Sequence, residues 1–142
     1  MNLFLFSERA DSYHLAADHP YAGHLAEVLR AGEAGRRFAV GVENGPRGLA
    51  RASREPGGGW VLAMDRWEPD SPSPGAIGLA LPYVRPAEAR RILREGACLG
   101  VSAFHWFPAD KGHAGYARAG LWSDPATVPE LLREGLRQGY HT

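Results

Sequence analysis

The chain has 142 residues, and 44% of them are hydrophobic, which is enough to bury a core in one compact domain or two small ones. Its 16 basic and 16 acidic side chains give a formal net charge of +0, so no overall field draws it to nucleic acid or anionic lipid, and any such binding must be local. A single cysteine, Cys98, excludes an internal disulfide and a thiolate metal site, and it favours a reducing, cytoplasmic compartment.

The first six residues, MNLFLF, are apolar but have no basic flank, and the polar residues Ser7, Glu8 and Arg9 follow directly. A signal peptide needs a basic flank, and a membrane span needs a much longer apolar stretch. We therefore expect a first strand here and no association with a membrane.

A short helix is predicted from Pro20, a residue favoured in the first helical turn, to a stop at Gly32. Its apolar residues recur at helical spacing: Tyr21, Leu25, Val28 and Leu29.

Strand signals dominate the next stretch. Residues 38–42 and 49–53 alternate in character around a turn at Asn44-Gly45, and residues 55–59 form another turn. Residues 60–67 follow as a strand with Trp60, Leu62 and Met64 on one face. Several short strands with one helix suggest a small β-barrel.

Residues 68–75 form a predicted linker, because three prolines, two serines and a glycine fall within eight positions. We place a boundary there, between a domain of residues 1–69 and a second of residues 70–142.

The second half alternates strand and helix. Residues 77–81 are typical of a strand buried on both faces, and residues 101–107 give a second strand. Between them, a helix is predicted from Pro86 to a stop at Gly100, with an inward stripe of Ala89, Ile92, Leu93, Gly96 and Leu99.

A last helix is predicted from a capping-box pattern at Thr127 and Glu130, with a stop at Gly139. Its inward residues are expected to be Val128, Leu131, Leu132 and Leu136. Two parallel strands are too few for an independent sheet, so this α/β part looks incomplete. The fold class expected for the whole chain is α+β.

Few residues suggest chemistry by themselves. The cluster Asp11, His14, Asp18, His19 and His24 lacks the spacing of metal ligands on one helical face, so no metal site is expected. His105 is interpreted as a buried histidine bonded to backbone, and Cys98 as a packing residue. The sequence contains no nucleophile elbow, P-loop or dinucleotide glycine fingerprint.

Arginine is the conspicuous residue, since 15 of the 16 basic side chains are arginine. A GC-rich genome is the first explanation, ahead of a need for planar, phosphate-binding forks. The arginines fall into three groups: Arg30, Arg36 and Arg37; Arg47, Arg51 and Arg54; and Arg85, Arg90, Arg91 and Arg94. Each group either lies on a solvated face, where nearby glutamates balance its positive charge, or contacts RNA. Arg90 and Arg94 stand one helical turn apart, which is unfavourable unless an anion lies between them.

Several motifs, taken together, resemble the RsmE-type family of RNA methyltransferases. They are HLAEVLR at 24–30, VGVENGPRG at 40–48, LALP at 79–82, LGV at 99–101, DKG at 110–112, and residues 138–142, all in family order. Two departures concern Glu95 and Cys98, where many members have lysine and glutamate. They put the identity of the substrate in doubt.

The resemblance implies a PUA-like N-terminal barrel that contributes to RNA binding, followed by a SPOUT domain with a trefoil knot. In that family the knot binds S-adenosylmethionine and forms the homodimer. Its glycine-rich cofactor loops have no counterpart in this sequence, so the cofactor site is expected beyond Thr142, in a longer natural protein. Arg85 would take the anion-binding role of a family lysine.

The first hypothesis is therefore an RNA methyltransferase that transfers a methyl group from S-adenosylmethionine to N3 of a uridine in small-subunit ribosomal RNA. The residues expected to contact RNA are Arg30, Arg47, Arg85, Arg90, Arg94 and His24, and no catalytic base is assigned. The alternative is a complete, non-catalytic module that binds RNA or protein. A third option is a small hydrolase that uses His105.

Overall fold

A computed structural model describes residues 3–30, 36–69 and 77–142, except for the side chain of Arg30. The chain forms two compact units, one of residues Met1–Ser71 with Thr142 and the other of residues Pro72–His141. Most of the predicted linker, from residue 70 onward, lies outside the described residues, as does the predicted helix stop at Gly32.

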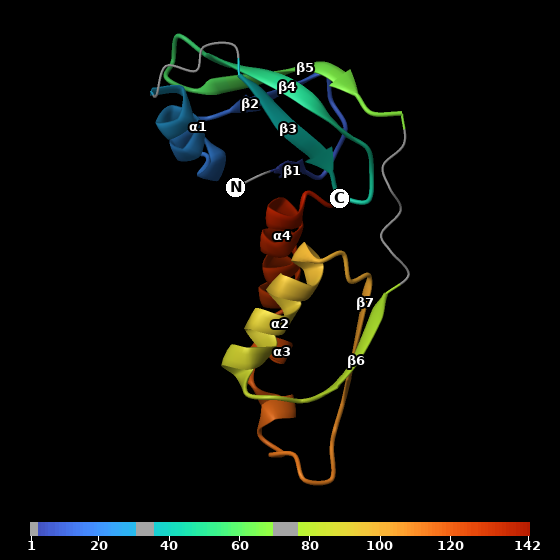
Figure 1. The fold of residues 1–142 in the computed structure, drawn as a ribbon. Helices are drawn as coiled ribbons and strands as arrows, with labels where there is room; N and C mark the ends of the chain where they lie inside the picture. The colour runs from blue at the N-terminus through green and yellow to red at the C-terminus, as the bar shows by residue number, and fades with distance from the viewer. Residues whose placement is uncertain (1–2, 31–35, 70–76) are drawn as a thin grey trace. The chain divides into compact units, whose positions relative to one another are not determined.

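The first unit contains a five-stranded mixed sheet in the order β1-β3-β4-β5-β2 (Figure 1). β1 is parallel to β3, and the remaining neighbours are antiparallel. The strands are β1 (Phe4–Phe6), β2 (Ser12–Leu15), β3 (Arg37–Val42), β4 (Arg47–Arg54) and β5 (Trp60–Trp67). The predicted small β-barrel is confirmed in part, as a curled half-barrel. Within the described residues its two edge strands, of three and four residues, pair with their inner neighbours and not with each other.

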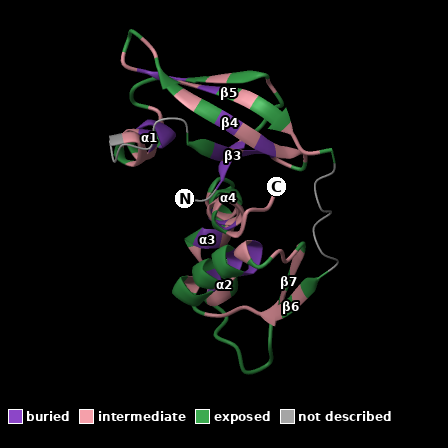
Figure 2. Ribbon diagram, turned by 45° about the horizontal axis from the view of Figure 1, so that its top comes forward, coloured by how far each residue is buried: buried purple, intermediate pink, exposed green. Residues whose placement is uncertain are grey.

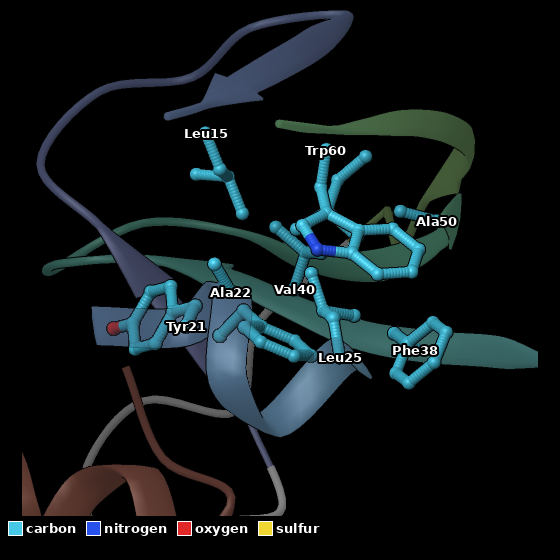
Figure 3. Close-up of a cluster of buried hydrophobic side chains, with 10 residues drawn as sticks. Leu15, Tyr21, Ala22, Leu25, Phe38, Val40, Ala50 and Trp60 are labelled. Carbon is cyan, nitrogen blue, oxygen red and sulfur yellow. The ribbon is translucent and has the colours of Figure 1, made fainter. Parts of the chain in front are cut away.

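Helix α1 (Pro20–Arg30) packs on one face of this sheet, as the close-up of the core shows (Figure 3). Leu25 of the helix meets Val40 and Leu62 of the sheet, and all three are fully buried. The predicted start at Pro20 is confirmed, and the backbone N–H of Tyr21 donates to His19 Nδ1 at 3.1 Å. His19 therefore caps the first turn of α1.

The predicted turns of the first unit are confirmed. Asn44 has a φ of 55° between β3 and β4, and Gly58 has a φ of 86° between β4 and β5. Trp60 and Leu62 are buried and Met64 is partly buried against the same cluster, as the alternation of the sequence predicts.

The second unit contains two parallel strands, β6 (Gly78–Pro82) and β7 (Ala103–Phe107). Its helical segments are α2 (Pro86–Cys98), the short 3₁₀ helix η1 (Tyr116–Arg118), α3 (Gly120–Ser123) and α4 (Thr127–Gly139). The core is small, and its buried members are Ala89, Leu93, Leu121 and Leu131. None of the helices in the described part of the chain is long and apolar enough to cross a membrane.

Three predictions about the burial of this unit are wrong. No residue of β6 is buried (Figure 2), and Ile77 just before it is 55% exposed. Among the described residues, the core of this unit packs against Phe104 and Trp106 of β7. Leu99 is 78% exposed, since α2 ends at Cys98 and Leu99 lies beyond its last turn. His105 is exposed on β7, so it is not a buried histidine.

The predicted end of α2 and both predicted ends of α4 are confirmed, whereas the capping-box bond predicted for Thr127 is not formed. Gly100 has a φ of 82°, and Val101 N–H donates to the Gly96 carbonyl, which closes α2. Thr127 caps nothing in α4. Instead, Asp124 accepts bonds from the Thr127 hydroxyl and from the Ala126 N–H. The residue in the left-handed conformation after α4 is Tyr140, with a φ of 62°.

Gly139 ends α4 as the sequence predicts, and it also has a packing role. A Cβ at Gly139 would overlap the carbonyl oxygen of Cys98, and one at Gly135 would overlap the carbonyl oxygen of Arg94. These two glycines therefore let α4 lie directly against the backbone of α2.

Candidate nucleic-acid interface

Arg85 lies where β6 leads into α2. Because β6 and β7 are parallel, the segments that follow Pro82 and Phe107 leave the same edge of the sheet, and Tyr83 N–H donates to the Phe107 carbonyl at 3.0 Å. Ligands of open α/β sheets bind at this carboxyl edge. The side chain of Arg85 is exposed there, and it makes no ion pair with any residue that the structure describes.

The arginines of α2 lie on its exposed side, as the sequence predicts. Arg91 pairs with Glu88 at 2.9 Å and Arg94 with Glu134 of α4 at 3.4 Å. The Glu134 carboxylate thus supplies an anion beside Arg94, which offsets the like charge of Arg90. All these side chains are well exposed, so the pairs are weak and exchangeable.

Arg90 makes no ion pair with any other residue that the structure describes. It lies near enough to Asp124 to influence that group. The pKa of Asp124 is lowered first by the hydrogen bond from Thr127, next by that from Ala126, and also by the charge of Arg90. Arg90 is thus the α2 arginine that is most available to an external anion.

The predicted contacts of the first unit are less open. The Arg47 side chain is only 14% exposed and lies 3.5 Å from a Glu68 carboxylate oxygen, so a phosphate would have to compete with Glu68. His24 is partly buried beside the Phe4 ring, and burial is the largest cause that lowers its pKa, which leaves the imidazole neutral near pH 7. Arg30 is the last residue of α1, and its side chain lies outside the described part.

Comparison with known proteins shows which proteins this chain is similar to. The ribosomal RNA small subunit methyltransferase E of Treponema pallidum is 30% identical over an alignment of 142 positions, which covers 97% of this chain and 52% of that protein. The chain is thus similar to an RsmE-type methyltransferase along almost its whole length. It spans about half the length of this curated relative, and no family model matches it.

Solved structures share the fold of this chain. A ribosomal RNA small subunit methyltransferase E from Neisseria gonorrhoeae, bound to S-adenosylmethionine, aligns with a TM-score of 0.69 at 15% identity, over 99% of this chain and 57% of that one. A predicted RNA methyltransferase from Thermotoga maritima aligns with a TM-score of 0.61 at 13% identity, over 99% and 60%. The mixed α+β architecture with a curled half-barrel is therefore shared with methyltransferases.

The fold also brings together basic residues that the sequence did not group. Arg37 and Arg51 belonged to separate sequence clusters and Arg66 to none, yet all three line one hollow on the first unit's sheet. This grouping depends on strand register, which the sequence alone does not reveal. Arg37 of β3 is the direct cross-strand partner of Arg51 in β4.

Proposed function

We propose that the protein containing this chain is an RNA methyltransferase that uses S-adenosylmethionine to methylate N3 of a uridine in small-subunit ribosomal RNA. The observation that carries the proposal is the 30% identity to a ribosomal RNA methyltransferase along 97% of the chain. The shared fold of the two units supports it. We expect the protein to act in the cytoplasm, where ribosomal RNA is located, and as a homodimer.

The two units would divide this work between two domains, residues 1–69 and 70–142. The half-barrel would be a PUA-like RNA-binding domain, and the β6-α2-β7-α4 unit the first part of a SPOUT domain. Many side chains on and beside β6 and β7 are exposed, as expected if this two-stranded sheet is part of a larger one.

Among the candidate RNA contacts, Arg85 and Arg90 fit the role best, because each is exposed and makes no ion pair with the described residues. Arg94 can contribute by exchanging Glu134 for a phosphate. We rank three other predicted RNA contacts, Arg30, Arg47 and His24, below these arginines. Arg47 is mostly buried, and His24 is neutral near pH 7.

The described residues do not fit S-adenosylmethionine itself. The hollow on the sheet is lined by three arginines and one aspartate, which repel a sulfonium cation and suit an anion. We therefore assign no residue of this chain to the cofactor and derive no catalytic step through it. When bound to the protein, the cofactor would supply the methyl group.

Methyl transfer from labelled S-adenosylmethionine to purified small ribosomal subunits tests the proposal. The whole protein should place label in the RNA and none in RNA that already carries the modification. RNA binding without any transfer would instead support the non-catalytic module.

A further inference from the structure

The outer face of the half-barrel carries a basic hollow made by three strands. Arg37 of β3, Arg51 of β4, and Asp65 and Arg66 of β5 line an open hollow of about 280 Å³. This is several times the ~30 Å³ that one water occupies in the liquid, so a tetrahedral anion can enter. The neighbours Phe38 and Ala50 point into the core (Figure 3), so Arg37 and Arg51 occupy the sheet face opposite α1.

A β-bulge explains how two consecutive residues reach the same hollow. Neighbours on a regular strand point to opposite faces. Here Leu49 pairs with Arg66 and Ala50 with Met64, so Asp65 is the extra residue of β5. Bulges re-aim side chains in this way, and they recur beside functional sites.

Asp65 organises the hollow without neutralising it. One of its oxygens, Oδ2, accepts hydrogen bonds from Arg37 Nε at 2.8 Å and Arg51 Nε at 3.1 Å. These bonds use Nε, so Asp65 does not engage the terminal nitrogens of either guanidinium. They also lower the pKa of Asp65, the Arg37 bond most, and so keep it ionised.

The hollow therefore holds three positive charges against one negative charge. Arg66 makes no ion pair with any described residue, and Arg37 and Arg51 remain 57% and 58% exposed. Asp65 offsets the repulsion between Arg37 and Arg51 across the strands, and Arg66 adds positive charge, so the hollow keeps a net positive charge that suits an external anion.

We propose that this hollow is a phosphate-binding subsite for the RNA backbone, in which Asp65 orients the guanidiniums of Arg37 and Arg51 and Arg66 completes the cradle. The choice of RNA as the source of the phosphate rests on the proposed function. Planar guanidinium forks match phosphate oxygens in pairs, and such contacts fix the position of the RNA without reading its sequence.

Fluorescence anisotropy with a labelled single-stranded RNA oligonucleotide tests the subsite, using the whole protein at several salt concentrations. Arg51→Ala and Arg66→Ala should each weaken binding about tenfold and lower the slope of log affinity against log salt by about 0.7. Asp65→Asn should tighten binding, because the amide oxygen still accepts the Nε bonds while the competing charge is gone.

Arg54→Gln is the matched control. It removes one positive charge from the same strand, but Arg54 lies over the Trp60 ring, 5.1 Å from its centroid, and not in the hollow. Circular dichroism should show that every variant is folded. If Arg51→Ala and Arg66→Ala bind RNA like wild type, or lose no more affinity than Arg54→Gln, the subsite is wrong.

Two further measurements complete the test. One distinguishes RNA from other polyanions, and the other distinguishes failure of the subsite from failure of the proposed methyltransferase function. Polyglutamate binding as tight as RNA, with the same dependence on Arg51 and Arg66, would overturn RNA as the ligand. Methyl transfer by wild type together with unaltered RNA binding by the variants would reject the subsite alone. Arginine-dependent RNA binding without methyl transfer would reject only the enzymatic proposal.

Discussion

Gly135 of α4 lies against the backbone of Arg94 in α2, so closely that a Cβ at Gly135 would overlap the Arg94 carbonyl oxygen and approach Ala97 Cβ to 2.7 Å. The contact continues one turn later at Gly139. It brings together the helix that carries the candidate arginines and the helix that carries Glu134, the partner of Arg94.

Gly135→Ala should therefore destabilise the second unit. Alanine favours the helix by about 1 kcal/mol, but the overlap is with backbone atoms that cannot rotate away. We expect a net loss of about 1–3 kcal/mol, as for other overpacked sites. Urea unfolding, with amide exchange of α2 and α4, measures it. Gly120→Ala is the control because no atom lies within 4 Å of a Cβ there, and equal stability of both variants would contradict close packing.

Asp124→Ala should destabilise α4 more than Glu130→Ala does. Asp124 accepts the bonds that order the first turn, whereas Glu130 makes only exposed pairs with Arg133 and Arg137. Thermal unfolding of the two variants compares them. A larger loss of thermal stability for Glu130→Ala would instead support the capping box that the sequence predicts at Thr127 and Glu130.

The first unit should lose stability as the pH falls from 8 to 5.5. Burial lowers the pKa of both His19 and His24, so the folded state binds protons less readily than the unfolded chain. Their contribution is complete above the ordinary histidine pKa of ~6.5 and decreases as the pH falls through the lowered values. Protonated His19 also cannot accept the Tyr21 N–H bond.

Urea midpoints at the two pH values test this dependence. His19→Asn keeps a neutral acceptor near Tyr21 and should reduce the difference between pH 8 and pH 5.5. A midpoint that is unchanged or higher at pH 5.5 in the wild type would contradict the assignment.

Arg85→Glu combined with Arg30→Glu should weaken RNA binding and flatten its salt dependence, since two phosphate contacts would become repulsive. Anisotropy with ribosomal RNA fragments measures both quantities. Arg118→Glu changes the same charge at an exposed residue of η1 and is the control for one substitution. Unaltered binding by the double variant would remove both residues from the interface.

Local patterns predicted much of this fold because the residues that form each element are close in sequence. Pro20 and the spacing of Leu25 mark α1, Asn44 and Gly58 mark the turns, and Gly100 marks the end of α2. Gly139 marks the end of α4 as predicted, but its close contact with the backbone of Cys98 depends on the packing of the two helices and is not visible in the sequence.

The candidate site was predicted less well, because charge clusters depend on register and burial. Arg47 reads as a surface arginine, yet its side chain is 14% exposed. Arg66 becomes part of a cluster only through the bulge at Asp65, which no local pattern marks.

The identity of the methylated atom tests the central claim most directly. Small-subunit RNA treated with the whole protein and S-adenosylmethionine would be digested to nucleosides and analysed by mass spectrometry against standards. The account predicts N3-methyluridine that depends on both protein and cofactor. Methylation at another base or at a ribose, or no methylated nucleoside in an RNA that the protein binds, would contradict it.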